Sequence, residues 1–154
     1  MTLYAANAGD ARIVLGHDGL ATRLTRDHRT DDPEEVERIE KAGGFMFKGR
    51  VVGVLAVTRS LGDHCMKKYV IAKPHVRETS IDLPPPQHET TTRTTPSFVI
   101  LACDGLWDVF EDQNAVDFVL GYYESHKVDV STLLINEALR RGTTDNVTVV
   151  VAWL

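Results

Sequence analysis

The sequence contains little cysteine and no long apolar run. Its two cysteines, Cys65 and Cys103, do not form a C-x-x-C pair, which excludes a disulfide framework and a zinc site built from cysteines. We expect Cys103 to be a small buried apolar residue. No apolar stretch approaches the roughly 20 residues that a membrane-spanning helix needs, and the N-terminal MTLYAANAGD lacks the pattern of a signal peptide. These absences predict a protein of the cytoplasm or nucleus without a membrane partner.

Clustered positive charge is also lacking. The formal net charge is -5 and the isoelectric point is about 5.6. Nucleic acids and anionic membrane surfaces bind clustered Lys and Arg, so neither is an expected partner. The sequence does have an ordinary globular composition, with 43% hydrophobic and 25% charged residues. A chain of 154 residues with this composition can bury the core of one domain.

Turn signals divide the start of the chain into strands. The signals lie at residues 7–10 and 17–19, and they predict short antiparallel strands at residues 2–6, 12–16 and 20–25. A domain rarely begins inside such a β-meander. We therefore expect the domain to be incomplete on its N-terminal side.

A helix with clear end signals follows the strands. Its start combines a capping aspartate, a proline at the first helical position and two acids that oppose the helix dipole, and its end is a glycine pair. These residues are Asp32, Pro33, Glu34, Glu35 and the pair Gly43–Gly44. The next segment, RVVGVLAV at residues 50–57, predicts a strand interrupted by Gly53.

The second half of the chain predicts one loop, two helices and two buried strands. The loop covers residues 84–97, which are rich in Pro and Thr. Helices are expected at about 112–124 and 131–141. Strands are expected at 98–102 and 147–153, and both would present unpaired edges if their neighbours were absent. Unpaired edges predict self-association of the chain.

Four aspartates lie at the ends or edges of predicted strands. They are Asp10, Asp63, Asp104 and Asp145, and each stands beside Gly, Ser, Thr or Asn. Alone, each would be a turn former or a helix cap. Asp104 differs because FVILA leads to it from a buried strand, where an unpaired carboxylate is costly. A cation is the simplest common partner for several such acids.

The residue types favour particular cations. Carboxylates without accompanying His or thiolate ligands favour Mg²⁺ or Mn²⁺ over zinc or copper. Such ions activate a water molecule and neutralise phosphoryl oxygens in the hydrolysis of phosphate esters. The residues themselves therefore indicate a metal-dependent phosphohydrolase.

Five segments, in order, resemble a known family. ANAGDAR, LTRDHRTDDPEEVERIEKAGG, RVVGVLAVTRSLGD, ILACDGLWDV and GTTDNVTVVV are similar to the successive C-terminal motifs of the PP2C-type (PPM family) metal-dependent Ser/Thr protein phosphatases. The resemblance implies an α+β fold, a sandwich of two antiparallel β-sheets flanked by helices. It implies that residues 1–154 are the C-terminal portion of one such domain, incomplete at the N-terminal side. The implied activity is hydrolysis of phosphoserine and phosphothreonine in protein substrates by a metal-activated water.

The resemblance also assigns metal ligands. It implies that Asp104 and Asp145 bind the catalytic pair of Mg²⁺ or Mn²⁺ ions, and that Asp10 and Asp108 bind a weaker third ion. Arg12 matches a structural arginine, and residues from about 27 to 50 match the flap that borders the active site. Asp63, in the SLGD motif, matches either a ligand or a turn residue.

Part of the family pattern is absent from the sequence. The pattern should begin with an arginine and an acidic pair, followed by an Asp-Gly-His-Gly motif. His17 in HDGL does not match, because it follows GDAR and the order is reversed. We therefore assign no general acid, and we expect activity only together with the N-terminal half of the active site.

Three functions remain open from the sequence. The chain is the C-terminal portion of an active phosphatase, an inactive phosphatase-like module that binds phosphoproteins or another partner, or a purely structural domain. An inactive module predicts eroded metal ligands, whereas all four acids are present. A structural domain leaves the acids at strand ends unexplained.

Overall fold

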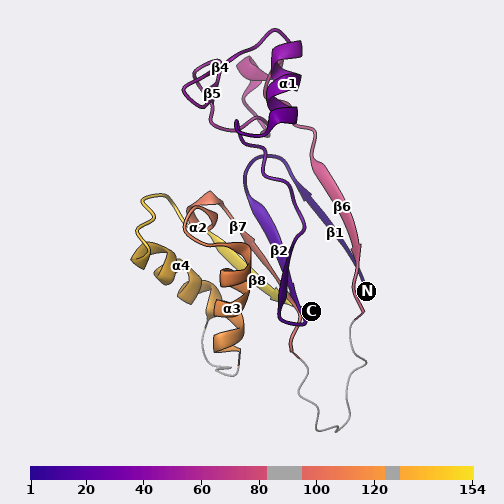
Figure 1. The fold of residues 1–154 in the computed structure, drawn as a ribbon, viewed down its shortest axis with the longest axis vertical. Helices are drawn as coiled ribbons and strands as arrows, with labels where there is room; N and C mark the ends of the chain where they lie inside the picture. Colours follow the sequence, from indigo (N-terminus) through magenta and orange to yellow (C-terminus); the bar gives the residue numbers. More distant parts are fainter. Residues whose placement is uncertain (83–94, 124–128) are drawn as a thin grey trace, which may run out of the picture. The chain divides into compact units, whose positions relative to one another are not determined.

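A computed structural model describes residues 1–82, 95–123 and 129–154 (Figure 1). The chain divides into two compact units. The first consists of Met1–Ala5, Arg12–Thr25 and Arg77–Leu154, and the second consists of Ala6–Ala11 and Arg26–Val76. Among the described residues, no helix has the length and hydropathy needed to cross a bilayer.

A four-stranded antiparallel sheet forms the centre of the first unit. The strand order is β3-β2-β7-β8, with bounds Leu20–Arg23, Arg12–His17, Phe98–Ala102 and Val149–Trp153. Asp18 and Gly19 join β2 to β3 with positive φ angles of 51° and 77°. Two such residues are what a tight hairpin turn requires, so the predicted hairpin at this position is confirmed.

Helices cover one face of this sheet. They are α2 (Asp104–Trp107), α3 (Asp112–Tyr122) and α4 (Val130–Arg140). Alternate residues of β7 are buried, as expected where one face of a strand packs on helices. Figure 1 shows α3 and α4 beside β7 and β8. The shared core includes Phe98, Ile100, Leu106, Val116 and Leu134, all fully buried.

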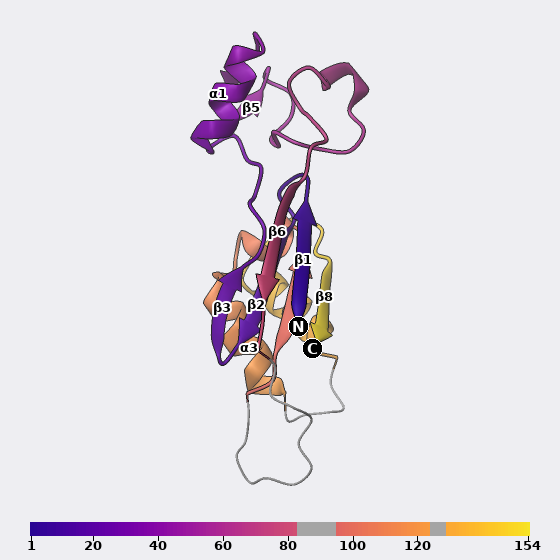
Figure 2. The ribbon, with the colours of Figure 1, turned by 90° about the vertical axis from the view of Figure 1, so that its right-hand side faces the viewer.

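A two-stranded sheet lies on the opposite face. It consists of β1 (Thr2–Asn7) and β6 (His75–Ser80), which run in opposite directions in Figure 2. Ala5 and Ile81 pack with Leu15 and Leu24 in a second buried cluster. The first unit is therefore layered, with a sheet on a sheet and helices outside.

The second unit is built around a short helix. It contains α1 (Pro33–Lys41), β4 (Met46–Phe47), β5 (Arg50–Val51) and the 3₁₀ helix η1 (His64–Met66). Ile39, Val51 and Val70 form its buried core. The predicted cap is confirmed, because the Asp32 side chain accepts a hydrogen bond from Glu34 N at 3.0 Å.

Two strand predictions near the N-terminus are wrong in part. Strand β1 pairs with β6 rather than with β2, and residues 6–11, which include the last two residues of β1, belong to the second unit. The predicted strand at 50–57 is only two residues long. It ends because Val52 and Gly53 have positive φ angles of 51° and 73°, which turn the chain out of the extended conformation.

The C-terminal half follows the predictions more closely. Both predicted helices are confirmed within two residues at each end. Strand β8 is an edge strand rather than buried, and Val150 and Trp153 are 53% and 46% exposed. Strand β7 is paired on both sides, so it presents no edge. Residues 84–94 of the predicted loop lie outside the described residues.

Candidate functional site

Asp104 stands where β7 meets α2. Cys103 is extended and its N donates to Thr148 O at 3.3 Å. Asp104 then begins α2, and its carbonyl accepts a hydrogen bond from Asp108 N at 2.8 Å. The indole Nε1 of Trp107 donates to Ala102 O at 3.0 Å and ties the helical turn to the end of the strand. The sequence thus fixes Asp104 and Asp108 at the two ends of one short helical turn whose middle residues are buried.

Gly105 allows two loops to touch. A Cβ atom at this position would lie 2.2 Å from Asn146 O and 3.1 Å from Asn146 C, so no side chain fits there. Cys103 Sγ donates to Asn146 O at 3.2 Å and accepts from Thr148 N at 3.3 Å. Cys103 is therefore a half-buried link between loops rather than the buried apolar residue that the sequence predicted. The backbones that carry Asp104 and Asp145 lie against each other.

Asp108 and Asp145 line the same pocket. Its volume is about 490 Å³, and its walls are residues 108–109 and 142–145. The Asp145 carboxylate accepts a hydrogen bond from Asn146 N at 2.7 Å. The backbone N–H of Asn146 thus orients this acid. Two of the four predicted ligands thus line one pocket, and Asp104 begins α2, whose next residue, Gly105, contacts the Asn146 backbone.

Arg141 joins the two walls of this pocket. Its guanidinium lies 3.7 Å from the centre of the Phe110 ring and donates to Val109 O at 3.2 Å. It also donates to Glu137 at 2.9 Å. Hydrogen bonds from Arg140 and Arg141 lower the pKa of Glu137 to about 2. The sequence alone did not single out Arg141, because an arginine near the end of a helix usually serves only to interact with the helix dipole.

Asp10 belongs to the second unit, where hydrogen bonds from Asn7 hold its loop. Asn7 Nδ2 donates to the carbonyls of Gly9, Ala11 and Arg26 at 3.1, 3.2 and 2.8 Å. These bonds fix the shape of the loop at residues 7–11. The Asp10 carboxylate lies 3.6 Å from Arg29 Nε and its side chain is 23% exposed.

Arg12 and Asp63 both make contacts that stabilise the fold. Arg12 is 9% exposed, pairs with Asp112 at 2.7 Å and stacks over Trp107 at 5.1 Å. Burial alone would raise the pKa of Asp112, but hydrogen bonds from Arg23 and Arg12 lower it. The prediction of a structural arginine is confirmed. Asp63 adopts a left-handed conformation with φ of 49° and accepts a hydrogen bond from Ser60 Oγ, which favours the turn role over the ligand role.

The acids suit Mg²⁺ or Mn²⁺ by their chemistry. Carboxylate oxygens are the ligands these ions prefer. Because Gly105 has no side chain, the segment that carries Asp104 can contact the segment that carries Asp145. Within residues 1–82, 95–123 and 129–154, however, no group of three His, Cys, Asp or Glu side chains is placed to hold one ion. The donors fit such an ion in kind, while a complete ligand set is not gathered in the described residues.

Comparisons with known proteins identify the family of the chain. The family model "Protein phosphatase 2C" matches residues 1–147. Protein phosphatase 2C homolog 1 of Saccharomyces cerevisiae is 45% identical over 152 residues, which cover 99% of this chain and 50% of that protein. Its Schizosaccharomyces pombe namesake is 47% identical over 99% of this chain and 40% of its own length. The chain thus spans half or less of the length of these two relatives.

Solved structures show the same fold. A phosphatase from Toxoplasma gondii superposes with a TM-score of 0.80 at 32% identity, over 99% of this chain and 48% of that one. A sex-determining protein of Caenorhabditis elegans gives a TM-score of 0.83 at 29% identity, over 99% of this chain and 36% of that one. The predicted α+β fold of the PP2C type is confirmed, and the chain belongs to the protein phosphatase 2C family.

Proposed function

We propose that residues 1–154 are the C-terminal portion of a single phosphatase domain, and that the complete protein hydrolyses phosphoserine and phosphothreonine in proteins with bound Mg²⁺ or Mn²⁺. The observation that supports this most strongly is the contact between the Asp104–Gly105 and Asp145–Asn146 backbones. An ordinary turn or cap does not need a second acid-bearing loop at contact distance. Two acids that bind the same metal site do need their backbones to lie this close.

Each acid has a role in this proposal. Asp104 and Asp145 would hold the catalytic pair of ions, and Asp10 and Asp108 would hold a weaker third ion. When bound, such ions lower the pKa of a water molecule that attacks phosphorus and neutralise the phosphoryl oxygens. The protein keeps the carboxylates in place: Asp104 by the turn of α2, and Asp145 by the N–H of Asn146.

The pocket between Asp108 and Asp145 supports a small polar ligand. Its volume of about 490 Å³ lies within the usual range for ligand pockets. Thr143 and Thr144, whose side chains carry hydroxyl groups, are among its lining residues. A phosphate ester needs hydrogen-bond donors of this kind beside the metal ligands.

An inactive phosphatase-like module that binds phosphoproteins is the second candidate. It is favoured by one observation, that the described residues gather no three metal-ligating side chains around one point. The two functions differ in turnover. An enzyme releases inorganic phosphate from a phosphopeptide in a metal-dependent way, whereas a binding module retains the phosphopeptide unchanged.

A chimera tests the proposal. The chimera is the S. cerevisiae relative with its matching segment replaced by residues 1–154, and it is called the yeast chimera below. We expect phosphate release from a phosphothreonine peptide in Mn²⁺ or Mg²⁺, loss of release in EDTA, and much weaker release from the matching phosphotyrosine peptide. Phosphopeptide binding without release would contradict the proposal and favour the binding module.

A further inference from the structure

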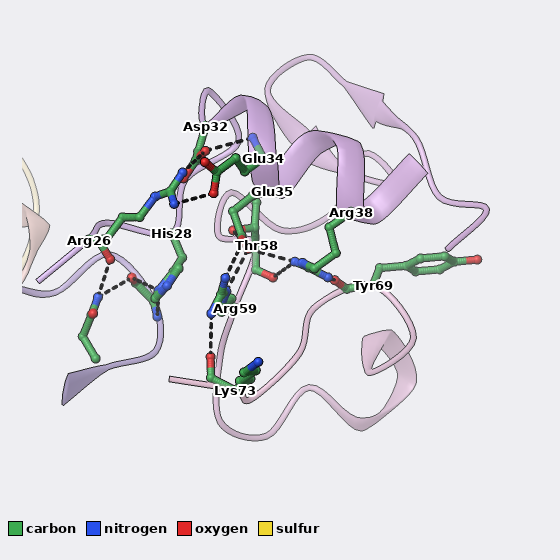
Figure 3. A network of polar contacts seen from close by, with 12 residues as sticks. Arg26, His28, Asp32, Glu34, Glu35, Arg38, Thr58, Arg59, Tyr69 and Lys73 are labelled. Atoms are coloured by element: carbon green, nitrogen blue, oxygen red, sulfur yellow. Dashed lines mark hydrogen bonds and ion pairs between the residues drawn. The ribbon is translucent and has the colours of Figure 1, made fainter. Parts of the chain in front are cut away.

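A buried carboxylate organises the second unit. Glu35, in the first turn of α1, is 2% exposed. Its carboxylate accepts hydrogen bonds from Thr58 Oγ1 at 2.9 Å, from Arg38 Nη2 at 2.9 Å and from Arg59 Nε at 3.0 Å, with a further bond from Arg59 Nη2 (Figure 3). One acid from a helix thus holds two arginines and a threonine.

The network keeps Glu35 ionised. Burial alone would raise its pKa, but the hydrogen bonds from Arg59, Arg38 and Thr58 outweigh burial and lower the pKa to about 2. Arg38 and Arg59 also donate to the carbonyls of Tyr69 and Lys73 at 2.6 and 3.0 Å. Arg38 donates to Thr58 O at 2.8 Å as well, so the network ties α1 to the backbone on both sides of η1.

The same network reaches the loop that carries Asp10. Thr58 N donates to His28 O at 2.9 Å, and His28 N donates to Gly9 O at 2.9 Å. The His28 ring is fully buried, with Nδ1 3.0 Å from Gly9 O. A Cβ atom placed on Gly9 would lie 3.6 Å from Arg59 O. A chain of hydrogen bonds through Thr58 and His28 thus connects Glu35 to Gly9, and the Arg59 backbone lies near Gly9.

Asp10 follows Gly9 directly, and its carboxylate is also held from this side. Arg29 Nε lies 3.6 Å from it, and the backbone of Arg29 forms an antiparallel bridge with Val57. Val57 precedes Thr58, the threonine bound to Glu35. The segment at residues 57–59 is thus fixed to Glu35 on one side and to the surroundings of Asp10 on the other.

We infer that Glu35 is a positioning residue for Asp10, the proposed third-metal ligand: through Thr58, Arg59 and His28 it holds the loop at residues 7–11 in the shape that presents the Asp10 carboxylate. The inference rests on the proposed function. Groups that orient metal ligands from a distance commonly change metal affinity when they are replaced. A buried ion pair can also serve stability alone, and the test separates the two roles.

Three substitutions in the yeast chimera test the inference. Glu35→Gln keeps the shape and removes the charge. Thr58→Val is the milder variant, because it removes one hydrogen bond at a fully buried position. Ile39→Ala is the matched control: it weakens the same helix in the core of the second unit but leaves the Glu35 contacts in place. Asp10→Ala sets the largest effect expected on the third metal.

Two measurements are made on each variant. The first is the Mn²⁺ concentration for half-maximal turnover of a phosphothreonine peptide, with kcat and KM measured separately. The second is hydrogen exchange of the peptide containing residues 6–11, which reports loop order without any turnover. We expect Glu35→Gln to raise the half-maximal Mn²⁺ concentration roughly tenfold, to lower kcat more than it raises KM, and to speed exchange in this peptide. Thr58→Val should show the same changes to a smaller extent.

The outcomes are distinct. Ile39→Ala should lower the melting temperature without changing the Mn²⁺ dependence. If Glu35→Gln and Thr58→Val behave like Ile39→Ala, losing stability with unchanged Mn²⁺ dependence and unchanged exchange at residues 6–11, Glu35 is structural only and the inference is overturned. A wild-type chimera that releases phosphate without any metal would overturn the proposed function instead, and the assignment of Asp10 with it.

Discussion

At the scale of single residues, the site depends on a position with no room for a side chain. A Cβ at Gly105 would meet Asn146 O at 2.2 Å, which is backbone and cannot rotate away. The sequence shows the DG pair beside its strand but not this contact, because Gly105 and Asn146 are 41 positions apart (146 - 105) in the chain. The glycine is therefore recognisable as part of a motif, whereas its physical role appears only in the fold.

Gly105→Ala should separate the two acid-bearing loops. We predict a loss of about 1–3 kcal/mol in the free energy of unfolding, the usual cost of forcing atoms into a packed site. Metal-dependent turnover per folded molecule should fall as well. Gly121→Ala is the control, because nothing lies within 4 Å of its added Cβ; it should be neutral or slightly stabilising. Urea unfolding and turnover of the yeast chimera measure both effects, and equal behaviour of the two variants would refute the account of Gly105.

Glu35 predicts a specific dependence of stability on pH. Its pKa in the folded protein is about 2, below its ordinary value of 4.5, so its stabilisation is fully present above pH 4.5 and disappears as the pH falls towards 2. The shift corresponds to roughly 3 kcal/mol at most. The difference in unfolding free energy between wild type and Glu35→Gln should therefore be large at pH 7 and shrink steadily below pH 4.5. A difference that is independent of pH would show that the charge of Glu35 contributes nothing.

At the scale of elements, the helix ends and the β2–β3 hairpin were predictable, whereas the pairing of β1 was not. Asp32, Pro33 and the glycines after α1 act on atoms within a few residues, so the sequence contains all that is needed to place the helix. The partner of β1 is β6, more than 60 residues away along the chain (75 - 7 = 68), and no local signal specifies it. For the same reason the burial of Glu35 was missed: its partner Arg59 lies 24 positions further on.

The cap of α1 gives a prediction at this scale. Asp32 accepts hydrogen bonds from Glu34 N at 3.0 Å and from Arg26 Nη2 at 2.7 Å. Asp32→Ala should cost about 1–2 kcal/mol of unfolding free energy. Glu37→Ala, on the exposed side of the same helix, should cost less than about 0.5 kcal/mol. Thermal unfolding of the two variants measures the contrast, and an equal loss would contradict the capping role.

At the scale of the whole molecule, the family and its fold could be predicted from ordered motifs, but the completeness of the site could not. The motifs identify four acids, and the structure places Asp108 and Asp145 on one pocket, with Asp104 at the start of α2. Asp10 belongs to the other compact unit. A metal site draws ligands from distant segments, so its geometry depends on the complete domain.

Strand β8 gives a prediction for the isolated chain. It is an edge of the four-stranded sheet, with Val150 and Trp153 53% and 46% exposed, and exposed apolar edges pair with other strands. We predict that the 154-residue chain self-associates with rising concentration in sedimentation. Val150→Lys should weaken the association, whereas Leu139→Lys, at a 54% exposed helical position, should not. Association that is unaffected by Val150→Lys would exclude β8 as the contact.

The most direct test of the central claim is kcat of the yeast chimera with Asp104→Asn, measured in saturating Mn²⁺ with a phosphothreonine peptide. The substitution keeps the shape of the side chain and removes its charge. If Asp104 holds the catalytic ions, kcat should fall by about 1000-fold, because metal ions supply several kcal/mol of transition-state stabilisation. Asp117→Asn, an exposed acid on α3, should leave kcat unchanged. A kcat for Asp104→Asn equal to that of Asp117→Asn would contradict the assignment of this chain's acids to the metal centre of a phosphatase.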